Sequence, residues 1–254
     1  MRRENVMTRP EENPARANSI SVIFPSYNEQ DNIRGSYASA TAVLRKLGFD
    51  YEIIFVDDGS TDATPQIADE LAATDQHVKA IHHPANLGYG AALKSGFAAA
   101  AKMLVFYTDC DGQFDLNELP PLIPLIRNCD VVSCFRMNRQ DGWVRSFNAF
   151  CWNKLVGLLF GLKLRDINCA FKLYKRKVFH RIELHSTGAL ISTEILAKAT
   201  TRGWVITQVG VHHFPRTLGK PTGAKPRVIL RAFAELIQLR RQLGILAKPA
   251  KASE

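Results

Sequence analysis

The chain has 254 residues, of which 46% are hydrophobic and 22% are charged, a composition that excludes collagen-like, coiled-coil and largely disordered proteins. The formal net charge of +9 is divided unevenly, because residues 1–135 hold 18 acidic and 11 basic residues (net −7) and residues 136–254 hold 6 acidic and 22 basic residues (net +16). An acidic half can hold a divalent cation, and a basic half can contact phosphates or a negatively charged membrane.

The N-terminal residues 1–18 carry charges and two prolines without an apolar stretch, so we predict a disordered tail and no signal peptide. The five cysteines form no C-x-x-C pair, which argues against a disulfide framework or a zinc finger and favours a reducing compartment. No segment has the roughly 20 apolar residues that a membrane-spanning helix needs. We therefore expect a protein that is soluble or lies on a membrane surface.

Short apolar runs alternate with stretches in which apolar residues recur every three or four positions. The runs predict buried strands and the stretches predict helices. Such alternation is typical of a single α/β domain with a mainly parallel central sheet flanked by helices. In chain order we predict a strand at 19–24, a helix at 30–47, a strand at 52–56, a helix at 64–73, a strand at 78–82, a helix at 91–101, and strands at 103–107 and 131–135.

Polar residues stand directly after three of the predicted strands. They are not needed to fold a sheet, and ligands of such sheets bind at the carboxyl ends of the strands. We therefore predict a functional site at this edge. The three groups are Tyr27-Asn28-Glu29, Asp57-Asp58 and Asp109-Cys110-Asp111.

The third group extends to a pattern that suits a hard metal ion. Asp109, Asp111 and Gln113 place two carboxylates and an amide oxygen on one tight turn. Oxygen ligands of this kind suit Mg²⁺ or Mn²⁺, and a nucleotide diphosphate can complete the coordination shell. The alternative is a polar turn in which an aspartate caps the next helix.

Other ligand classes are disfavoured by their missing motifs. Gly88, Gly90 and Gly96 do not satisfy G-x-G-x-x-G, and no P-loop sequence occurs. The pairs His82-His83 and His212-His213 have no Cys or Glu at zinc spacing and are interpreted as strand-end residues. The basic residues form no recognisable RNA or DNA motif, so we expect no nucleic-acid partner.

Four motifs stand in one order along the chain, and together they resemble the signature of the family 2 glycosyltransferases. The resemblance is greatest to the branch of dolichyl-phosphate mannose synthase and related polyprenyl-phosphate sugar transferases, and it runs from about residue 19 to about residue 225. It implies a nucleotide-sugar-binding domain of the GT-A type. The motifs are Pro25-Ser26-Tyr27-Asn28-Glu29, Asp57-Asp58-Gly59-Ser60-Thr61-Asp62, Asn86-Leu87-Gly88-Tyr89-Gly90-Ala91-Ala92 and Asp109-Cys110-Asp111-Gly112-Gln113.

The resemblance also implies roles for residues on the donor side. Asp109, Asp111 and Gln113 would hold the metal on the diphosphate. The segment from Pro215 to Lys220 resembles a flexible R-x-x-G loop that closes over the donor, although Pro221 and Thr222 replace a commoner Ser-Lys pair. Nucleotide-sugar contacts are implied for Pro25, Tyr27, Glu29, Asp57, Asp58, Gly88, Arg216 and Lys220.

On the acceptor side, the resemblance implies that Arg136 and Arg145 receive a lipid phosphate. A guanidinium group pairs bidentately with phosphate oxygens, so this role is chemically reasonable. The segment from Asp166 to Lys172 resembles D-x-x-S-G-F-K, with Cys169 and Ala170 in place of Ser-Gly. Glu194 matches a later acidic residue near the acceptor region, and its alternative is an exposed helix glutamate.

Two further stretches predict amphipathic helices in the basic half, at residues 146–162 and 227–246. Their basic flanks favour contact with an anionic membrane surface, whereas packing on the core would give the same periodicity. The predicted organisation is a tail at 1–18, a transferase domain at 19–225, an amphipathic helix at 226–246 and a tail at 247–254.

These observations predict a metal-dependent inverting glycosyltransferase that moves a hexose, with mannose or glucose expected, from GDP-mannose or a UDP-sugar to a polyprenyl phosphate. We expect it to lie peripherally on the cytoplasmic face of a membrane, where a membrane-protein partner is compatible with the arrangement. One alternative keeps the donor chemistry with a glycolipid, polysaccharide or protein acceptor. Another is a non-catalytic, membrane-associated scaffold that binds nucleotide sugars.

Overall fold

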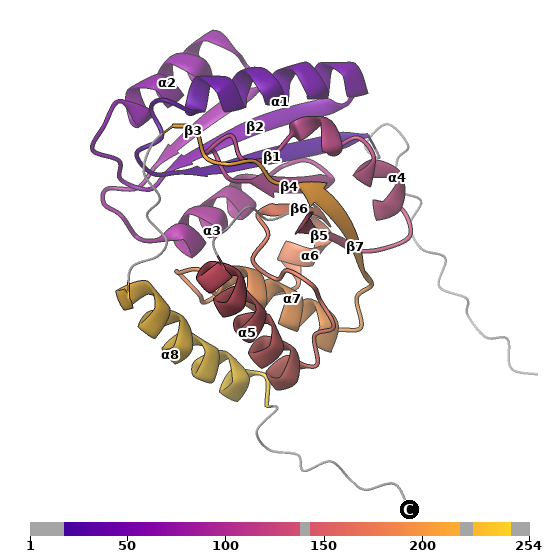
Figure 1. Ribbon diagram of the computed structural model, residues 1–254. Helices are drawn as coiled ribbons and strands as arrows, with labels where there is room; N and C mark the ends of the chain where they lie inside the picture. Colours follow the sequence, from indigo (N-terminus) through magenta and orange to yellow (C-terminus); the bar gives the residue numbers. More distant parts are fainter. Residues whose placement is uncertain (1–17, 138–142, 219–225, 245–254) are drawn as a thin grey trace, which may run out of the picture.

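The computed structural model describes residues 18–137, 143–218 and 226–244. Their centre is a seven-stranded sheet in the order β3-β2-β1-β4-β6-β5-β7 (Figure 1). Every neighbouring pair is parallel except the two that involve β6, which confirms the mainly parallel sheet. The strands are β1 (Ser19–Ser26), β2 (Asp50–Asp57), β3 (Val78–His82), β4 (Leu104–Thr108), β5 (Val131–Met137), β6 (Phe171–Lys175) and β7 (Ile206–His212).

Helices cover both faces of the sheet, with α1 and α2 on one face and α3, α5 and α7 on the other (Figure 1). Helix α8 lies outermost, beside α5. The helices are α1 (Ile33–Leu47), α2 (Thr64–Thr74), α3 (Tyr89–Ala99), the 3-10 helix η1 (Leu116–Glu118), α4 (Leu122–Ile126), α5 (Trp143–Phe160), α6 (Lys177–His180), α7 (Ile191–Thr201) and α8 (Pro226–Gln242).

Each face of the sheet has its own apolar core. On the first face, residues such as Val43 of α1 and Leu71 of α2 pack on strand residues such as Phe55. On the second face, Phe97 of α3 and Ile195 of α7 pack on the other side of the same strands. A sheet buried on both faces explains why the strands are continuous apolar runs instead of alternating ones.

Strands β6 and β7 do not follow from the apolar pattern of the sequence. β6 reads FKLYK, and its Lys172 is fully buried, with Nζ donating to the backbone oxygen of Cys169. β7 is half-buried over most of its length. A buried lysine and a partly exposed edge both weaken the apolar run by which a central strand is recognised.

The apolar stripes of the two predicted amphipathic helices are divided between the core and the surface. Leu236 and Leu239 of α8 are buried in the second core, whereas Phe233 and Ile237 are 44% and 55% exposed. On α5, Leu158 is 84% exposed. Core packing therefore accounts for part of the predicted stripes, and among the described side chains of α5 and α8, Leu158, Phe233 and Ile237 are the large apolar ones on the surface. Within the described ranges, no helix has the length and apolar character required to cross a bilayer.

The loop between α6 and α7 is fastened to the fold by a buried ion pair. The Glu194 carboxylate accepts hydrogen bonds from the backbone N–H groups of His185 and Ser186 and from Lys198 Nζ, the last at 2.6 Å. Its side chain is 1% exposed, so the alternative of an exposed helix glutamate is wrong. The loop in turn reaches α3, because the Thr187 carbonyl accepts from the N–H groups of Gly90 and Ala91.

Replacing Glu194 should therefore destabilise the fold in a pH-dependent way. Burial raises the pKa of Glu194, but the bonds from Lys198, His185 and Ser186 outweigh it and lower the pKa below the usual value. Glu194 therefore has a lower pKa in the folded protein than in the unfolded chain. The stabilisation is fully present above the unfolded pKa of about 4.3 and is lost as the pH falls through the folded pKa.

We expect Glu194→Gln to lower the free energy of unfolding by about 3 kcal/mol at neutral pH, since it leaves the Lys198 charge buried without its partner. Urea unfolding at neutral pH and near pH 3.5 measures the difference, which should shrink in acid. The control is Glu70→Gln, which breaks the exposed Arg34–Glu70 pair and should cost less than about 0.5 kcal/mol. A loss from Glu194→Gln that is the same at both pH values would contradict the assignment.

Gly90 offers a test of the contact between this loop and α3. A Cβ atom there would lie 2.7 Å from the Gly188 carbonyl oxygen and 2.8 Å from the Ser186 carbonyl oxygen. Because these are backbone atoms, Gly90→Ala should cost about 1–3 kcal/mol in thermal or urea unfolding. Gly35→Ala on α1, where a Cβ would meet nothing within 4 Å, is the matched control and should be neutral or stabilising by up to about 1 kcal/mol.

Candidate active site

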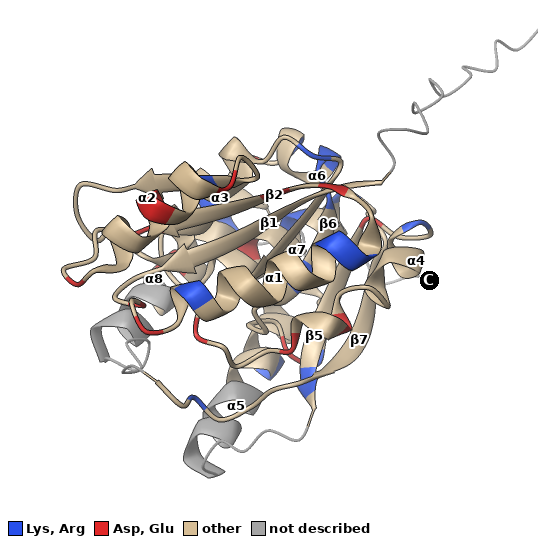
Figure 2. Cartoon of the chain, turned by 90° about the horizontal axis from the view of Figure 1, so that it is seen from above, with Lys and Arg blue, Asp and Glu red and all other residues tan. Residues whose placement is uncertain are grey.

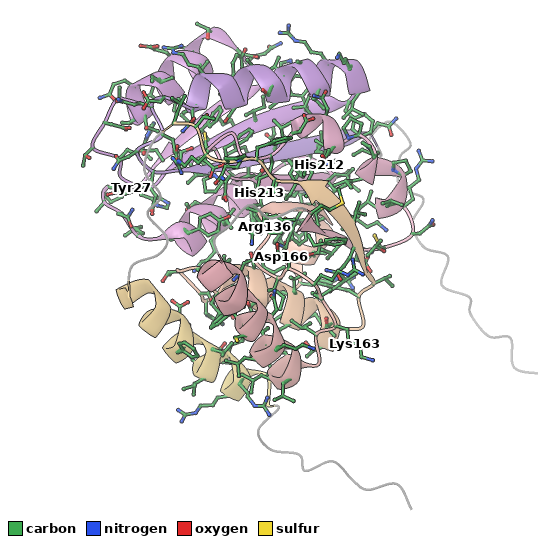
Figure 3. All side chains as sticks on the ribbon, in the orientation of Figure 1. Tyr27, Arg136, Lys163, Asp166, His212 and His213 are labelled. Atoms are coloured by element: carbon green, nitrogen blue, oxygen red, sulfur yellow. The ribbon has the colours of Figure 1, made fainter. Side chains whose placement is uncertain are left out.

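The loops that leave β1 and β2 are bonded to each other at the carboxyl edge of the sheet. Asn28 donates its backbone N–H to Ser60 Oγ at 2.9 Å, and its side-chain oxygen accepts from the backbone N–H of Thr61 at 2.8 Å. Asn28 has a φ of 55°, a left-handed conformation that asparagine tolerates better than most residues. This turn presents Tyr27 at the edge (Figure 3), with Glu29 two residues further along the chain, while Pro25 lies within β1, opposite Val56.

Asp57 and Asp58 end β2, and both are almost fully buried. Asp57 Oδ1 accepts from the backbone N–H of Ser60 at 3.0 Å. Asp58 accepts from the backbone N–H groups of Leu87 and Gly88, at 3.0 and 2.8 Å. Asp58 thus holds the loop in which Gly88 has a φ of 107°, a conformation that favours glycine. Neither aspartate caps α2, whose N-cap residue is Ala63.

Asp109 and Asp111 follow β4 and interact electrostatically. Asp109 Oδ1 accepts from the Tyr89 hydroxyl at 2.9 Å. Burial raises the pKa of Asp109 to about 7, and the neighbouring Asp111 charge adds to the effect. Burial also raises the pKa of Glu29, with Asp111 again contributing in the same direction. The carboxyl groups of Glu29, Asp109 and Asp111, which follow two neighbouring strands, therefore interact electrostatically in a poorly solvated place.

The segment after β7 supplies a positively charged side chain, Arg216, to this acidic cluster. Gln113 and Phe214 exchange two hydrogen bonds: Phe214 N–H donates to the Gln113 carbonyl at 2.9 Å, and Gln113 Nε2 donates to the Phe214 carbonyl at 2.8 Å. Two residues later, Arg216 Nη2 donates to both carboxylate oxygens of Glu29 at 2.7 Å. Arg216 Nη1 lies 3.7 Å from Asp111 Oδ2. Arg216 thus contacts Glu29, which is predicted to bind the nucleoside, and lies beside Asp111, which is predicted to bind the metal.

The donor set suits a divalent cation chemically, although in the described part of the chain no three His, Cys, Asp or Glu side chains form a metal-binding group. The predicted set has two carboxylates and the amide of Gln113. The Gln113 amide nitrogen is engaged by Phe214, which leaves its oxygen as the atom of ligand character. Hard oxygen atoms beside two carboxylates that repel each other fit Mg²⁺ or Mn²⁺.

On the acceptor side, Arg136 forms a bidentate pair with Asp166, and the two side chains lie side by side in Figure 3. Nε and Nη2 of Arg136 donate to the two Asp166 carboxylate oxygens at 2.7 and 3.0 Å. The Arg136 charge lowers the pKa of Asp109 against the larger effect of burial, so the two groups are electrostatically coupled. Arg145 lies in α5, but its side chain is outside the described part of the structure, as is Lys220.

Three side-chain contacts of the predicted site residues are not evident from the sequence alone. The Tyr89 hydroxyl binds Asp109, the Asp166 carboxylate binds Arg136, and His82 Nδ1 lies 3.3 Å from Asp57 Oδ2. Tyr89 and Asp166 stand inside the motifs of the sequence, but without a stated partner. The pairing of His82 with Asp57 could have been found from the register of two parallel strands that end together.

Comparison with known proteins identifies the family to which the chain belongs. Residues 21–183 match the model of the family described as glycosyl transferase family 2. The chain is 31% identical over 212 residues to undecaprenyl-phosphate 4-deoxy-4-formamido-L-arabinose transferase of Enterobacter sp. (strain 638). The alignment covers 83% of this chain and 64% of that relative, so the chain spans somewhat less than two thirds of the relative's length.

Two solved structures share the fold. Mannosyl-3-phosphoglycerate synthase from Rubrobacter xylanophilus superposes with a TM-score of 0.69 at 19% identity, covering 94% of this chain and 82% of that one. Glucosyl-3-phosphoglycerate synthase from Mycobacterium tuberculosis, in complex with Mn²⁺, UDP-glucose and phosphoglyceric acid, has a TM-score of 0.68 at 20% identity, covering 92% and 86%. Because the family model matches well over half of the residues, and the strand-end motifs lie together on this fold, the chain belongs to glycosyl transferase family 2.

Proposed function

We propose that the protein is a metal-dependent, inverting glycosyltransferase that moves a hexose, mannose or glucose, from a nucleotide diphosphate sugar to a polyprenyl phosphate at a cytoplasmic membrane surface. The observation that carries the proposal is the convergence of Glu29, Asp109 and Asp111 at the carboxyl edge of a family 2 fold. The relative from Enterobacter, whose name specifies undecaprenyl phosphate, supports a polyprenyl phosphate acceptor.

The donor half of the proposal follows from the geometry of the edge. Tyr27, Glu29 and Asp57 would contact the base and ribose, since they lie on the two interlocked loops after β1 and β2. Asp109, Asp111 and Gln113 would hold Mg²⁺ or Mn²⁺ against the diphosphate. The bound metal would stabilise the negative charge that develops on the leaving nucleoside diphosphate.

The acceptor half requires orientation more than proton transfer. An acceptor phosphate is already ionised near neutral pH, so one of its oxygens can attack the anomeric carbon while the bond to the nucleoside diphosphate breaks. Attack from the face opposite the leaving group inverts the configuration. Arg136, held in plane by Asp166, and Arg145 on α5 would bind the acceptor phosphate.

Arg216 and Lys220 would complete the donor site from the segment after β7. Arg216 contacts both Glu29 and Asp111, so its guanidinium group already lies among the groups assigned to the donor. In the donor complex it would neutralise phosphate charge beside the metal. Its contacts support a role on the donor side and not on the acceptor side.

The first experiment follows label from nucleotide sugars into polyprenyl phosphate. The panel contains GDP-mannose, UDP-glucose and nucleotide-linked 4-deoxy-4-formamido-L-arabinose, with Mg²⁺ or Mn²⁺ and with 3-phosphoglycerate as an alternative soluble acceptor. Chelator-sensitive transfer of one sugar into the organic phase is the expected result. Donor binding without any transfer to lipid would leave the donor assignment standing and overturn the acceptor assignment.

Asp111→Asn tests the metal assignment. The variant keeps an oxygen for the Gln113 N–H bond but removes the charge, so turnover should fall at least about 100-fold while thermal stability is maintained. Asp115→Asn is the control, because Asp115 only accepts from Asn117 in the next turn and asparagine serves equally there. Near-normal turnover in Asp111→Asn would overturn the metal assignment.

Membrane contact would involve a narrower surface than the full predicted stripes. Leu158 of α5 and Phe233 and Ile237 of α8 are exposed, and Trp152 and Phe233 join the two helices through an edge-to-face ring contact at 5.5 Å. The last turn of α8 carries Arg240 and Arg241. Exposed apolar side chains beside basic residues suit an anionic lipid surface.

The double variant Leu158→Glu/Ile237→Glu should therefore reduce sedimentation with anionic liposomes by about tenfold or more. Binding of the native protein should also weaken as salt rises. Val205→Glu is the matched control, because Val205 is 53% exposed but directly precedes β7 and belongs to neither α5 nor α8. Equal loss of liposome binding in the control, or no loss in the double variant, would contradict this surface.

A further inference from the structure

Two histidines at the end of β3 face the two aspartates at the end of β2. The strands are parallel, and Asp57 is paired with His82 in their register. His82 Nδ1 lies 3.3 Å from Asp57 Oδ2, and His83 Nδ1 lies 2.7 Å from Asp58 Oδ1. Asp57 and Asp58 therefore each have their own imidazole partner.

His82 also contacts a second carboxylate. Its Nε2 lies 3.0 Å from Asp69 Oδ1 of α2, the helix whose acidic segment is red in Figure 2. An ionised carboxylate can only accept hydrogen bonds, and a neutral imidazole has a single N–H group. Two simultaneous bonds to carboxylates therefore require both ring nitrogens to carry protons, so His82 makes them as an imidazolium ion.

His83 differs in its second partner. Its Nε2 lies 2.8 Å from Ser95 Oγ, and a hydroxyl can donate to an unprotonated ring nitrogen. A neutral His83 can thus satisfy both contacts, donating to Asp58 and accepting from Ser95. The adjacent histidines have similar positions, but only His82 needs the positive charge.

The carboxylate of Asp57 is held from two sides. Oδ1 accepts from the Ser60 N–H at 3.0 Å, and Oδ2 is bonded by His82. Without the second bond, the Ser60 bond alone would leave the carboxylate freer to rotate about its Cβ–Cγ bond. A group that contacts a nucleoside through hydrogen bonds needs a defined plane, so the state of His82 should influence that contact.

We infer that His82, backed by Asp69, is a positioning residue that fixes the Asp57 carboxylate for the donor nucleoside while it is charged. The inference rests on the proposed function, in which Asp57 contacts the base or ribose. The charged groups that face His82 are Asp57 from β2 and Asp69 from α2. Neutralising His82 releases one of the two bonds, so affinity for the donor nucleotide falls as the pH rises.

The direction of titration agrees with this geometry. Burial lowers the pKa of His82, but the hydrogen bonds and charges of Asp69 and Asp57 outweigh it and raise the pKa above its usual value. The imidazolium form thus persists to higher pH than in an exposed histidine.

The experiment measures the dissociation constants of UDP and GDP, with Mn²⁺, by calorimetry between about pH 6 and pH 8.5. The probes titrate too, so each variant is compared with the native protein at the same pH. His82→Gln should bind the preferred nucleotide about tenfold more weakly than the native protein near pH 6, with the gap shrinking to about twofold near pH 8.5. His77→Gln is the control, because His77 lies just before the other end of β3, stacked on Tyr51.

Asp69→Asn separates positioning from mere structural support. Asp69 is on the surface, with its side chain 68% exposed, so the variant should fold normally. It should keep native affinity near pH 6. As the pH rises, its affinity should begin to fall at a lower pH than that of the native protein, because His82 then holds its proton less tightly. The ring C–H resonance of His82 should show the same downward shift of its titration midpoint in NMR spectra.

The outcomes distinguish this inference from the function on which it depends. If neither nucleotide binds the native protein at any pH, the donor assignment itself fails. If one nucleotide binds, but His82→Gln and Asp69→Asn keep the native pH profile, the donor assignment stands and the role of His82 is wrong. If His82→Gln does not fold, Asp69→Asn and the NMR titration of the native protein decide the question.

Discussion

The burial of several carboxylates together at one sheet edge is the constraint on which the rest of the site depends. Glu29 leaves β1, and Asp109 and Asp111 leave β4, which is the neighbour of β1 in the sheet. Parallel pairing brings their carboxyl ends together, so the topology forces the acids into one poorly solvated place. Burial raises the pKa values of Glu29 and Asp109, and the charge of Asp111 adds to the effect on both. A fold that keeps such a cluster must offset it with positive charge.

Arg216 supplies part of that charge from a distant part of the chain. It is 187 residues from Glu29 in sequence, and it reaches the cluster because the segment after β7 is bonded to the Gln113 turn. The contact therefore couples the last strand of the sheet to the first. Asp111 lies beside Arg216 and is also one of the groups proposed to hold the metal ion, so Arg216 and the metal ion would both balance its negative charge. Donor and metal binding should then be linked to the position of the segment after β7.

The sequence predicts the elements that have strong local signals and misses those that depend on distant partners. Five strands appear as apolar runs, and the polar groups after them mark the edge where the structure brings them together. Strand β6 is hidden because Lys172 is buried within it, an outcome that depends on the carbonyl of Cys169. The Arg136–Asp166 pair is equally invisible, since it joins residues 30 apart through the antiparallel pairing of β5 and β6. Amphipathic periodicity could not separate Leu236, which is buried, from Phe233, which is 44% exposed, because residues three positions apart lie on the same side of a helix.

The arrangement of β2 and β3 shows how one sheet edge can combine rigid and adjustable parts. Asp58 is held by two backbone N–H groups and by His83, whose other ring nitrogen meets the Ser95 hydroxyl, so these contacts do not require a charged histidine. Asp57 has a single backbone partner, and its other oxygen depends on a histidine that needs its charge. The first carboxylate shapes the Gly88 loop, which must be constant for α3 to begin correctly. The second is the carboxylate proposed to contact the donor nucleoside, so a partner that can be gained or lost there would change binding without disturbing the fold.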